Sequence, residues 1–333
     1  MKYHYNFVLF NAHDSKWFVN HKAYYTICVE DLYRESEIVV VSWPLDYANI
    51  IVRFLFNVHN SEIINKRINL PLKQMWYPFY FKHHFNNNKP YCFVIINHYY
   101  PDSYFLYLKK TYPNCKIVLL HRDLLSRFVP PLTGKPFIDL EMTYDKNEAS
   151  IHKMVHFNEF ESKITILRSE CYPESDVYFA GHIKDRLEKV LAAYHSFTEA
   201  GLKCKFYLVG VEESKRVELP GIEYGNSFIP YSEMLFHSVN SRCILEINQD
   251  LADGYTSRFL EAVMFNKKLI TNNESVRNSE FFRPDYIQIV NDFSKINTDF
   301  VNNNVKVDYK YNNQFSPLHL ISKIDSILSA KTQ

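Results

Sequence analysis

Residues 253–273 read D-G-Y-T-S-R-F-L-E-A-V-M-F-N-K-K-L-I-T-N-N, and they decide the fold prediction. Gly254 marks a turn, and Thr256 or Ser257 is placed to cap a helix that begins beside it. The apolar residues that follow recur at the spacing of one helical face, and Lys267–Thr271 then predicts a short buried strand. A loop, a helix and a strand in this order are typical of an α/β domain.

The polar residues of this stretch indicate a binding site for an anion. Asp253, Arg258 and Glu261 lie off the apolar face, so we expect them on the open side of the helix or at its mouth. The free N–H groups and the dipole of a helix start favour a phosphate at that place. The stretch therefore predicts a ligand-binding corner.

Charge and composition exclude several classes of protein. Lys and Arg number 38 against 37 Asp and Glu, so there is no bulk basic field to hold a nucleic acid. No segment approaches the ~18 consecutive apolar residues of a membrane span, and the apolar run near the N-terminus is too short for a signal peptide. The six cysteines form no C-x-x-C pair, which predicts free thiols in a reducing compartment. Cytoplasmic residence is the resulting expectation.

The glycines place any phosphate site in the second half of the chain. Residues 1–133 contain none of the seven glycines. The dinucleotide-binding fingerprint and the P-loop both need backbone that only glycine permits. A glycine-rich phosphate cradle is therefore excluded from the first half.

Short apolar runs alternate with helical patterns along the chain, as in βαβ units with a parallel sheet. Strands are expected at residues 7–10, 37–41, 92–97, 116–120, 176–180, 204–209, 243–247, 267–271 and 286–290. Helices are expected at residues 104–112 and 185–200 and near the C-terminus, whereas residues 57–89 carry no clear pattern. We therefore expect an α/β protein with two Rossmann-like domains, residues 1–165 and 166–333, whose parallel sheets face a central cleft.

The C-terminal half resembles the GT-B glycosyltransferases, especially bacterial enzymes of capsule and lipopolysaccharide synthesis. Many members carry E-G-F-G-x-x-x-x-E-A-x-x-x-G-x-P-V-I. Asp253-Gly254-Tyr255 is similar to the opening of that pattern, and Glu261-Ala262 is similar to its later E-A, with the carboxylates eight positions apart as in the family. The chain departs from the pattern at Thr256, which replaces the second glycine, and at Asn266 and Lys268, which replace G and P.

The resemblance implies an enzyme that takes a nucleotide diphosphate sugar in its C-terminal domain and binds its acceptor in the N-terminal domain. It implies that Glu261 binds the ribose hydroxyls and that Asp253 faces the donor sugar. A carboxylate suits the ribose because it can accept two hydrogen bonds from a cis-diol.

A second similarity to the family lies in A-G-H-I-K-D-R, which ends at Arg186. The resemblance implies that Gly181 lets the backbone approach the diphosphate and that Lys184 or Arg186 neutralises it. Arg258 is a third candidate for this charge. Neutralising the leaving nucleoside diphosphate lowers a large part of the barrier to glycosyl transfer.

The catalytic base is expected in the N-terminal domain, because ligands of open α/β sheets bind at the carboxyl ends of the strands. His13 and Asp14 follow the first predicted strand, and His98 follows the third. Asp123 follows the fourth, beside His121. A histidine or carboxylate at these positions could remove the proton of an acceptor hydroxyl.

The sugar is expected to be transferred to a hydroxyl of a glycan or of a lipid-linked acceptor. Residues 75–84, M-W-Y-P-F-Y-F-K-H-H, could stack on a sugar or make peripheral contact with the inner face of the membrane, although core packing is the favoured interpretation of the rings. No D-x-D motif stands near a strand end, and the resemblance implies basic groups and helix ends in place of a metal. We therefore expect metal-independent transfer without a cofactor.

Two other functions remain open on the same architecture. One is a nucleotide-sugar epimerase, which would convert the donor without an acceptor. The other is a non-catalytic binding subunit of a glycan assembly complex, in which Glu261→Ala would leave the output of the pathway unchanged.

Overall fold

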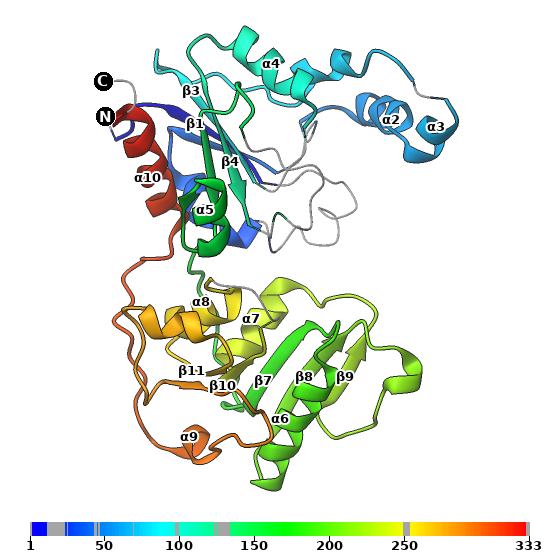
Figure 1. The fold of residues 1–333 in the computed structure, drawn as a ribbon. Coiled ribbons are helices and arrows are strands. Elements are labelled where there is room, and N and C mark those ends of the chain that lie inside the picture. Colours follow the sequence, from blue (N-terminus) through cyan, green and yellow to red (C-terminus); the bar gives the residue numbers. More distant parts are fainter. Residues whose placement is uncertain are drawn as a thin grey trace. The chain divides into compact units, whose positions relative to one another are not determined.

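The computed structural model describes residues 2–11, 24, 26–42, 45, 47–68, 70–96, 100–122, 125, 134–248 and 254–330. The chain divides into two compact units (Figure 1). Unit 1 consists of Met1–Phe157 and Pro317–Gln333, and unit 2 consists of Asn158–Ser316. Among the described residues, no helix is both long enough and apolar enough to cross a bilayer.

Unit 1 is built on a six-stranded sheet in the order β2-β1-β3-β4-β5-β6, with every neighbouring pair parallel. The strands are β1 (Asn6–Phe10), β2 (Ile38–Val41), β3 (Tyr91–Ile96), β4 (Lys116–His121), β5 (Leu140–Thr143) and β6 (Val155–His156). The central strands are buried along almost their whole length, as expected for a parallel sheet covered on both faces. This is why their sequences are continuous apolar runs.

Helices and 3-10 turns connect these strands. They are η1 (Glu30–Arg34), α2 (Ile50–His59), α3 (Glu62–Arg67), η2 (Lys73–Phe79), α4 (Asp102–Thr111), α5 (Lys146–His152) and the C-terminal α10 (Pro317–Ala330). Tyr104, Phe105 and Leu108 of α4 pack into the core over β1, β3 and β4. Residues 57–89, which carried no clear sequence pattern, contain the C-terminal end of α2 and the whole of α3 and η2.

The C-terminal helix belongs to unit 1, whereas the sequence analysis placed it in a second domain of residues 166–333. Asp325 of α10 accepts hydrogen bonds from the backbone N–H of His4 at 2.8 Å and pairs with the His4 ring at 2.7 Å. Lys323 donates to the carbonyl of His156 at 2.8 Å. These contacts join α10 to the N-terminal segment and to β6, and Figure 1 shows α10 beside the first sheet. The division after residue 157 also precedes the expected boundary at 165.

Unit 2 has a second six-stranded parallel sheet, in the order β12-β11-β10-β7-β8-β9. Its strands are β7 (Ser175–His182), β8 (Cys204–Val209), β9 (Ile222–Gly225), β10 (Ser241–Glu246), β11 (Lys268–Thr271) and β12 (Ile287–Ile289). Its helices and 3-10 turns are α6 (Leu187–Glu199), η4 (Glu213–Lys215), α7 (Tyr231–Val239), α8 (Ser257–Met264), η5 (Glu274–Asn278) and α9 (Asp299–Asn302). The expected succession of loop, helix and strand after residue 253 is confirmed by α8 and β11.

Two parallel sheets with helices on their faces confirm the α/β, Rossmann-like prediction for both units. The core of unit 2 lies on both sides of its sheet. One cluster contains Phe197 and Phe206, and the other contains Phe259 and Leu269. All six cysteines, each within the described part of the chain, are free, and only Cys171 is exposed.

Candidate functional site

In the sheet of unit 2, the order in which the chain adds strands reverses between β7 and β10. From β7 the chain builds β8 and β9 on one side, then crosses to the other side of β7 to form β10 and β11. In open α/β sheets the crevice outside the carboxyl ends at such a reversal is the usual ligand site. The two stretches singled out from the sequence leave these strands: 181–186 ends β7 and 254–261 follows β10. The fold therefore brings both stretches to one switch point.

Arg186 ties the two sides of this switch point together. Its guanidinium donates to the carbonyl of Ile247, just after β10, and to the carbonyl of His182 at the end of β7. Burial lowers the pKa of Arg186, and the carboxylates of Asp185 and Glu246 oppose that shift. Arg186, at the start of α6, therefore holds a cation between the carboxyl ends of β7 and β10.

The glycine and the lysine of the same loop fit the expected anion site in different ways. A Cβ at Gly181 would stand 3.3 Å from the Phe179 ring and 3.9 Å from a guanidinium nitrogen of Arg186, so the missing side chain leaves room for both. Lys184 is exposed and has a φ of 48°, in the left-handed region. Lys184 therefore lies at the surface, on a turn of this loop.

The start of α8 is formed as the sequence predicted. Thr256 is the N-cap: its hydroxyl oxygen accepts a hydrogen bond from the N–H of Phe259 at 3.4 Å. Ser257 is the first helical residue. Asn273 donates to the carbonyl of Gly254 at 2.8 Å, which fixes the turn before the helix. The first N–H groups of α8 thus lie beside the carboxyl end of β10.

Arg258 and Glu261 form a buried ion pair on α8. One guanidinium nitrogen of Arg258 lies 2.5 Å from each oxygen of Glu261, and the other donates to the carbonyl of Ala180 in β7 at 3.3 Å. Burial alone would lower the pKa of Arg258, but the neighbouring Glu261 carboxylate holds it above its ordinary value. Arg258 therefore reaches across the switch point from β10 toward β7, in the direction opposite to Arg186.

Glu261 does not face the open side of the helix, and that expectation is wrong. Its side chain is fully buried. Besides Arg258, it accepts hydrogen bonds from Ser238 at 2.8 Å and from Tyr231 at 3.1 Å. The sequence could not reveal this, because both hydroxyls come from α7. The ribose contact implied by the resemblance stays a prediction, and in the described arrangement Glu261 anchors Arg258.

A further carboxylate, Glu246, was missed by the sequence analysis. It ends β10, is buried, and accepts hydrogen bonds from the hydroxyls of Thr256 and Thr271. Burial raises the pKa of the Glu246 carboxyl, and the two hydroxyls oppose this. The available signal was a glutamate inside the apolar run C-I-L-E-I. This residue links the end of β10 to the cap of α8 and to the end of β11.

Several predicted site residues lie outside the described residues. They are Asp253, His13, Asp14, His98 and Asp123. Their roles stay predictions. Among the described residues, no group of three or more His, Cys, Asp or Glu side chains is placed to hold a metal ion.

Three histidines stand near the positions suggested for a catalytic base, and of these His121 lies within the described residues. It ends β4 in unit 1. It is buried, and its Nε2 has no hydrogen-bond partner among the described residues. Burial lowers the pKa of His121 to about 4, with His152 as a second cause. The imidazole is therefore neutral at neutral pH, the form in which a histidine accepts a proton.

We expect His121 to make unit 1 less stable in acid. The unfolded chain takes up this proton near its ordinary pKa of about 6.5, so stability present above that pH is lost as pH falls toward 4. His121→Gln should remove a loss of about 2 kcal/mol in the free energy of unfolding between pH 7 and pH 5. Urea unfolding at about pH 7 and about pH 5 measures it. All three tryptophans lie in residues 1–157, so their fluorescence reports on unit 1.

His319→Gln on the exposed surface of α10 is the matched control for this experiment. It removes an imidazole from the same unit without emptying a buried position. If His121→Gln and the wild type lose equal stability between the two pH values, the buried neutral state of His121 is contradicted.

Comparison with known proteins identifies the fold. No protein-family profile matches the chain, and no curated protein matches it. The solved structure of Anabaena HepE in complex with UDP and glucose aligns with 98% of this chain and 100% of its own, at 9% identity and a TM-score of 0.53. The chain has the GT-B fold.

Other solved structures are similar at lower scores. A Methanocaldococcus jannaschii UDP-GlcNAc 2-epimerase aligns with 97% of this chain and 99% of its own, at 12% identity and a TM-score of 0.46. T4 phage BGT, in complex with its UDP-glucose substrate, aligns with 72% of this chain and 77% of its own, at 15% identity and a TM-score of 0.40. The alignment with HepE confirms the GT-B prediction at the level of the fold.

Proposed function

We propose that this protein is a glycosyltransferase that moves a sugar from a nucleotide diphosphate sugar to a hydroxyl of a glycan or lipid-linked acceptor. The observation that carries the proposal is the pair of arginines, Arg186 and Arg258, which cross the switch point of unit 2 in opposite directions. The start of α8 lies at the same edge of the sheet. Two fixed cations and a helix start form an environment suited to a diphosphate.

The chemistry of this site suits the departure of a nucleoside diphosphate. As the bond from the anomeric carbon to the diphosphate oxygen breaks, negative charge grows on that oxygen. Fixed cations stabilise such charge without reorganising, because they are already held by backbone carbonyls and by Glu261. Lys184, exposed on the same loop as Arg186, would add a third positive charge. HepE, whose fold this chain shares, was solved with UDP and glucose, which supports a uridine nucleotide as the first donor to test.

The acceptor would bind in unit 1, where a base removes its hydroxyl proton. Residues 13 and 14 follow β1, and His98 follows β3. The sheet of unit 1 changes direction between β1 and β3, so the sequence places these candidates directly after its two switch-point strands. Synthesis of a bacterial surface glycan, such as capsule or lipopolysaccharide, is the cellular role that the sequence resemblance supports, in the cytoplasm.

The proposal predicts that a nucleotide sugar stabilises the protein and is turned over without a metal. A panel of UDP and GDP sugars is expected to contain one that raises the free energy of unfolding by RT ln(1 + [L]/Kd), which a higher melting temperature reveals. Transfer of this sugar to an acceptor should persist in EDTA, because arginines take the place of a divalent cation in neutralising the diphosphate.

Lys184→Ala should weaken binding of the nucleotide by about fivefold to tenfold.

Lys203→Ala is the matched control, because this exposed lysine precedes β8 at the opposite, amino edge of the sheet. Loss of transfer in EDTA that returns with Mn²⁺ would contradict the metal-independent mechanism. Conversion of the donor sugar without any acceptor would indicate an epimerase. Binding without turnover of donor, across a broad acceptor panel, would indicate a binding subunit.

A further inference from the structure

The helix α2 carries its apolar stripe toward solvent. Ile51, Phe54, Leu55 and Val58 follow the i, i+3, i+4, i+7 spacing of one helical face, and all four are exposed. Val52 belongs to the opposite face, together with Phe56 and His59, and this face is partly buried. A surface helix of a soluble domain normally has the reverse arrangement. No residue of α2 is buried.

This outward stripe belongs to a helix that is held in place. The Phe56 ring packs edge-on against Trp76 of η2, with centroids 5.4 Å apart. The Trp76 indole N–H donates to Nδ1 of His59 at 2.6 Å, and Nε2 of His59 lies 2.9 Å from the carbonyl of Pro71. Lys73 donates to the carbonyl of His59. The inner face of α2 is therefore fixed on η2, and the exposed stripe is a defined surface.

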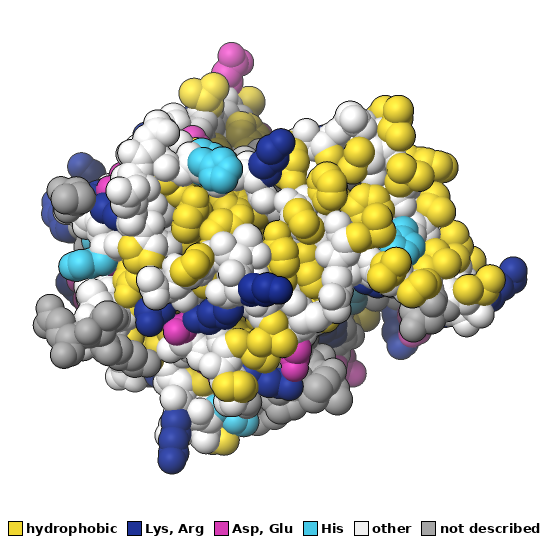
Figure 2. All heavy atoms as spheres, turned by 90° about the horizontal axis from the view of Figure 1, so that it is seen from above, with side chains coloured by type: hydrophobic (Ala, Val, Ile, Leu, Met, Phe, Trp, Pro, Cys, Tyr) yellow, Lys and Arg dark blue, Asp and Glu magenta, His cyan; other side chains and the backbone are white. Residues whose placement is uncertain are grey.

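The apolar surface continues beyond α2 onto α3 and η2. We call it the α2–α3 patch. Its large exposed side chains are Ile50, Ile51, Phe54, Leu55, Val58, Ile63, Ile68, Leu72, Met75 and Phe79, with exposed fractions between 39% and 83%. Figure 2 shows hydrophobic side chains gathered on the right of the view, over the end of unit 1 that carries α2 and α3. A contiguous patch of this kind marks an interaction site.

Basic residues accompany the patch. Between residues 49 and 84 there are five Lys and Arg and one acidic residue, although the whole chain is almost balanced. Lys66 and Arg67 end α3, and both are exposed. Figure 2 shows Lys and Arg side chains at the rim of the hydrophobic surface. The occupant of the patch should therefore be apolar with negative charge at its edge.

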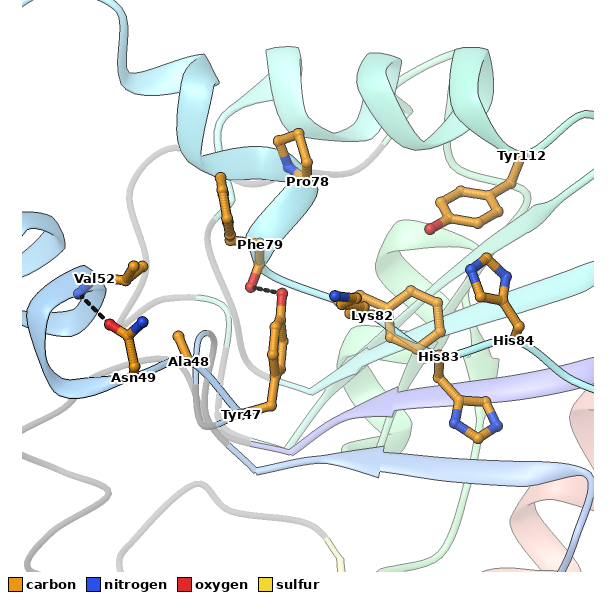
Figure 3. A pocket seen from close by; sticks show the side chains of 11 residues that line it. Tyr47, Ala48, Asn49, Val52, Pro78, Phe79, Lys82, His83, His84 and Tyr112 are labelled. Atoms are coloured by element: carbon orange, nitrogen blue, oxygen red, sulfur yellow. Dashed lines mark hydrogen bonds between the residues drawn. The ribbon is translucent and has the colours of Figure 1, made fainter.

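A cavity with basic side chains opens beside the first turn of α2. It has a volume of about 470 Å³. Tyr47 and Asn49 lie on one side, and Lys82, His83 and His84 approach from the segment after η2 (Figure 3). The Tyr47 hydroxyl donates to the carbonyl of Phe79 at 2.6 Å and so joins the two sides. The Lys82 ammonium and the ring nitrogens of the two histidines suit a phosphate group as the ligand of this cavity.

We propose that the α2–α3 patch docks on an anionic bilayer, with its apolar side chains among the acyl chains and a lipid phosphate in the neighbouring basic cavity. Apolar insertion and attraction to anionic lipid are the two signals that together give stable peripheral binding. A second copy of this chain is a poorer occupant. A symmetric dimer through this face would bring its basic rims together. The inference concerns unit 1 and stands independently of the donor site in unit 2.

Flotation with lipid vesicles tests the proposal on the whole 333-residue chain. Vesicles of phosphatidylcholine with phosphatidylglycerol should carry the protein, and vesicles of phosphatidylcholine alone should carry much less. Phe54→Glu is expected to lower partition by about tenfold or more, because it places a charge in the inserted stripe. Replacing Lys66 and Arg67 by alanine should weaken binding to the anionic vesicles by about fivefold for each charge removed.

Ile151→Glu is the matched control for Phe54→Glu, because Ile151 on α5 of the same unit is 72% exposed and lies outside the patch. It should bind vesicles like the wild type. The proposal is overturned if the wild type ignores anionic vesicles, or if Phe54→Glu and Ile151→Glu bind equally. It is also overturned if sedimentation shows a dimer that Phe54→Glu dissociates while vesicle binding is absent. Nucleotide-induced stabilisation of Phe54→Glu reports on unit 2 separately, so either proposal can fail alone.

Discussion

Replacing Glu261 by alanine is expected to destabilise unit 2 by about 3–5 kcal/mol, because it leaves Arg258 buried without its carboxylate. Glu261 is fully buried, and Arg258 contacts both of its oxygens. The same change should abolish most of the turnover, since it also releases Arg258 from the switch point. Hydrogen exchange of the amides of β10, α7 and α8 measures the local loss in this two-unit protein.

Two companion variants separate the charge from the packing. Glu261→Gln keeps the shape and part of the hydrogen bonding, so its loss of stability should be smaller than that of alanine. The double variant Arg258→Met, Glu261→Leu removes both charges, and stability should return to within about 1 kcal/mol of the wild type. Turnover should stay low in the double variant, because Arg258 is then absent from the donor site. Unchanged exchange in Glu261→Ala would contradict the buried pair.

Arg186→Ala is expected to lower kcat/KM for transfer by about 10²- to 10³-fold, the range found when one fixed donor to a developing negative charge is removed. The residue is held by the carbonyls of Ile247 and His182, so its cation is in place before the donor binds. Arg186→Lys should recover little activity. An ammonium keeps the charge but lacks the planar fork that bonds two carbonyls at once.

The control for Arg186 is Arg242→Ala. Arg242 is exposed near the amino end of β10, where it pairs with Asp176 at 3.2 Å, so its loss should leave kcat/KM near the wild-type value. UDP affinity distinguishes a positioning role from a direct one. Weaker UDP binding with unchanged hydrogen exchange would support contact with the diphosphate. Wild-type turnover in Arg186→Ala would reject the donor site as described.

Much of the local structure at the proposed donor site could be predicted from residue order alone. Gly254, the cap at Thr256, the helix of α8 and the strand of β11 follow from local rules, because turn, cap and periodicity each depend on residues within about one helical turn. The loop after β7 was singled out by its similarity to the family, and its position at the end of a strand is confirmed. The environment of Glu261 could not. Its partners Tyr231 and Ser238 are 30 and 23 residues away in the sequence, on α7.

In unit 1, too, neighbouring residues predicted some of the elements, whereas contacts between residues far apart in the sequence decided others. The strands β1 to β4 were predicted from apolar runs, whereas β5 and β6 were not. Residues 57–89, which include α3 and η2, had no clear sequence pattern. Local periodicity in α2 is present. Which of its two apolar faces meets the protein depends on Trp76, 17 residues beyond His59. The outward stripe that suggests membrane docking therefore became visible only after η2 was placed.

The residues of this chain by themselves determined two α/β units with parallel sheets, a helix start after Gly254 and a near-balanced net charge. Each of these features depends on composition or on neighbours in the chain. Only the tertiary structure decided that α10 returns to unit 1, that Glu261 is turned inward, and that Arg186 and Arg258 cross one switch point. These features depend on contacts between segments far apart in sequence. Such contacts form when packing brings strand ends together, and no local pattern encodes which partner each buried charge will meet.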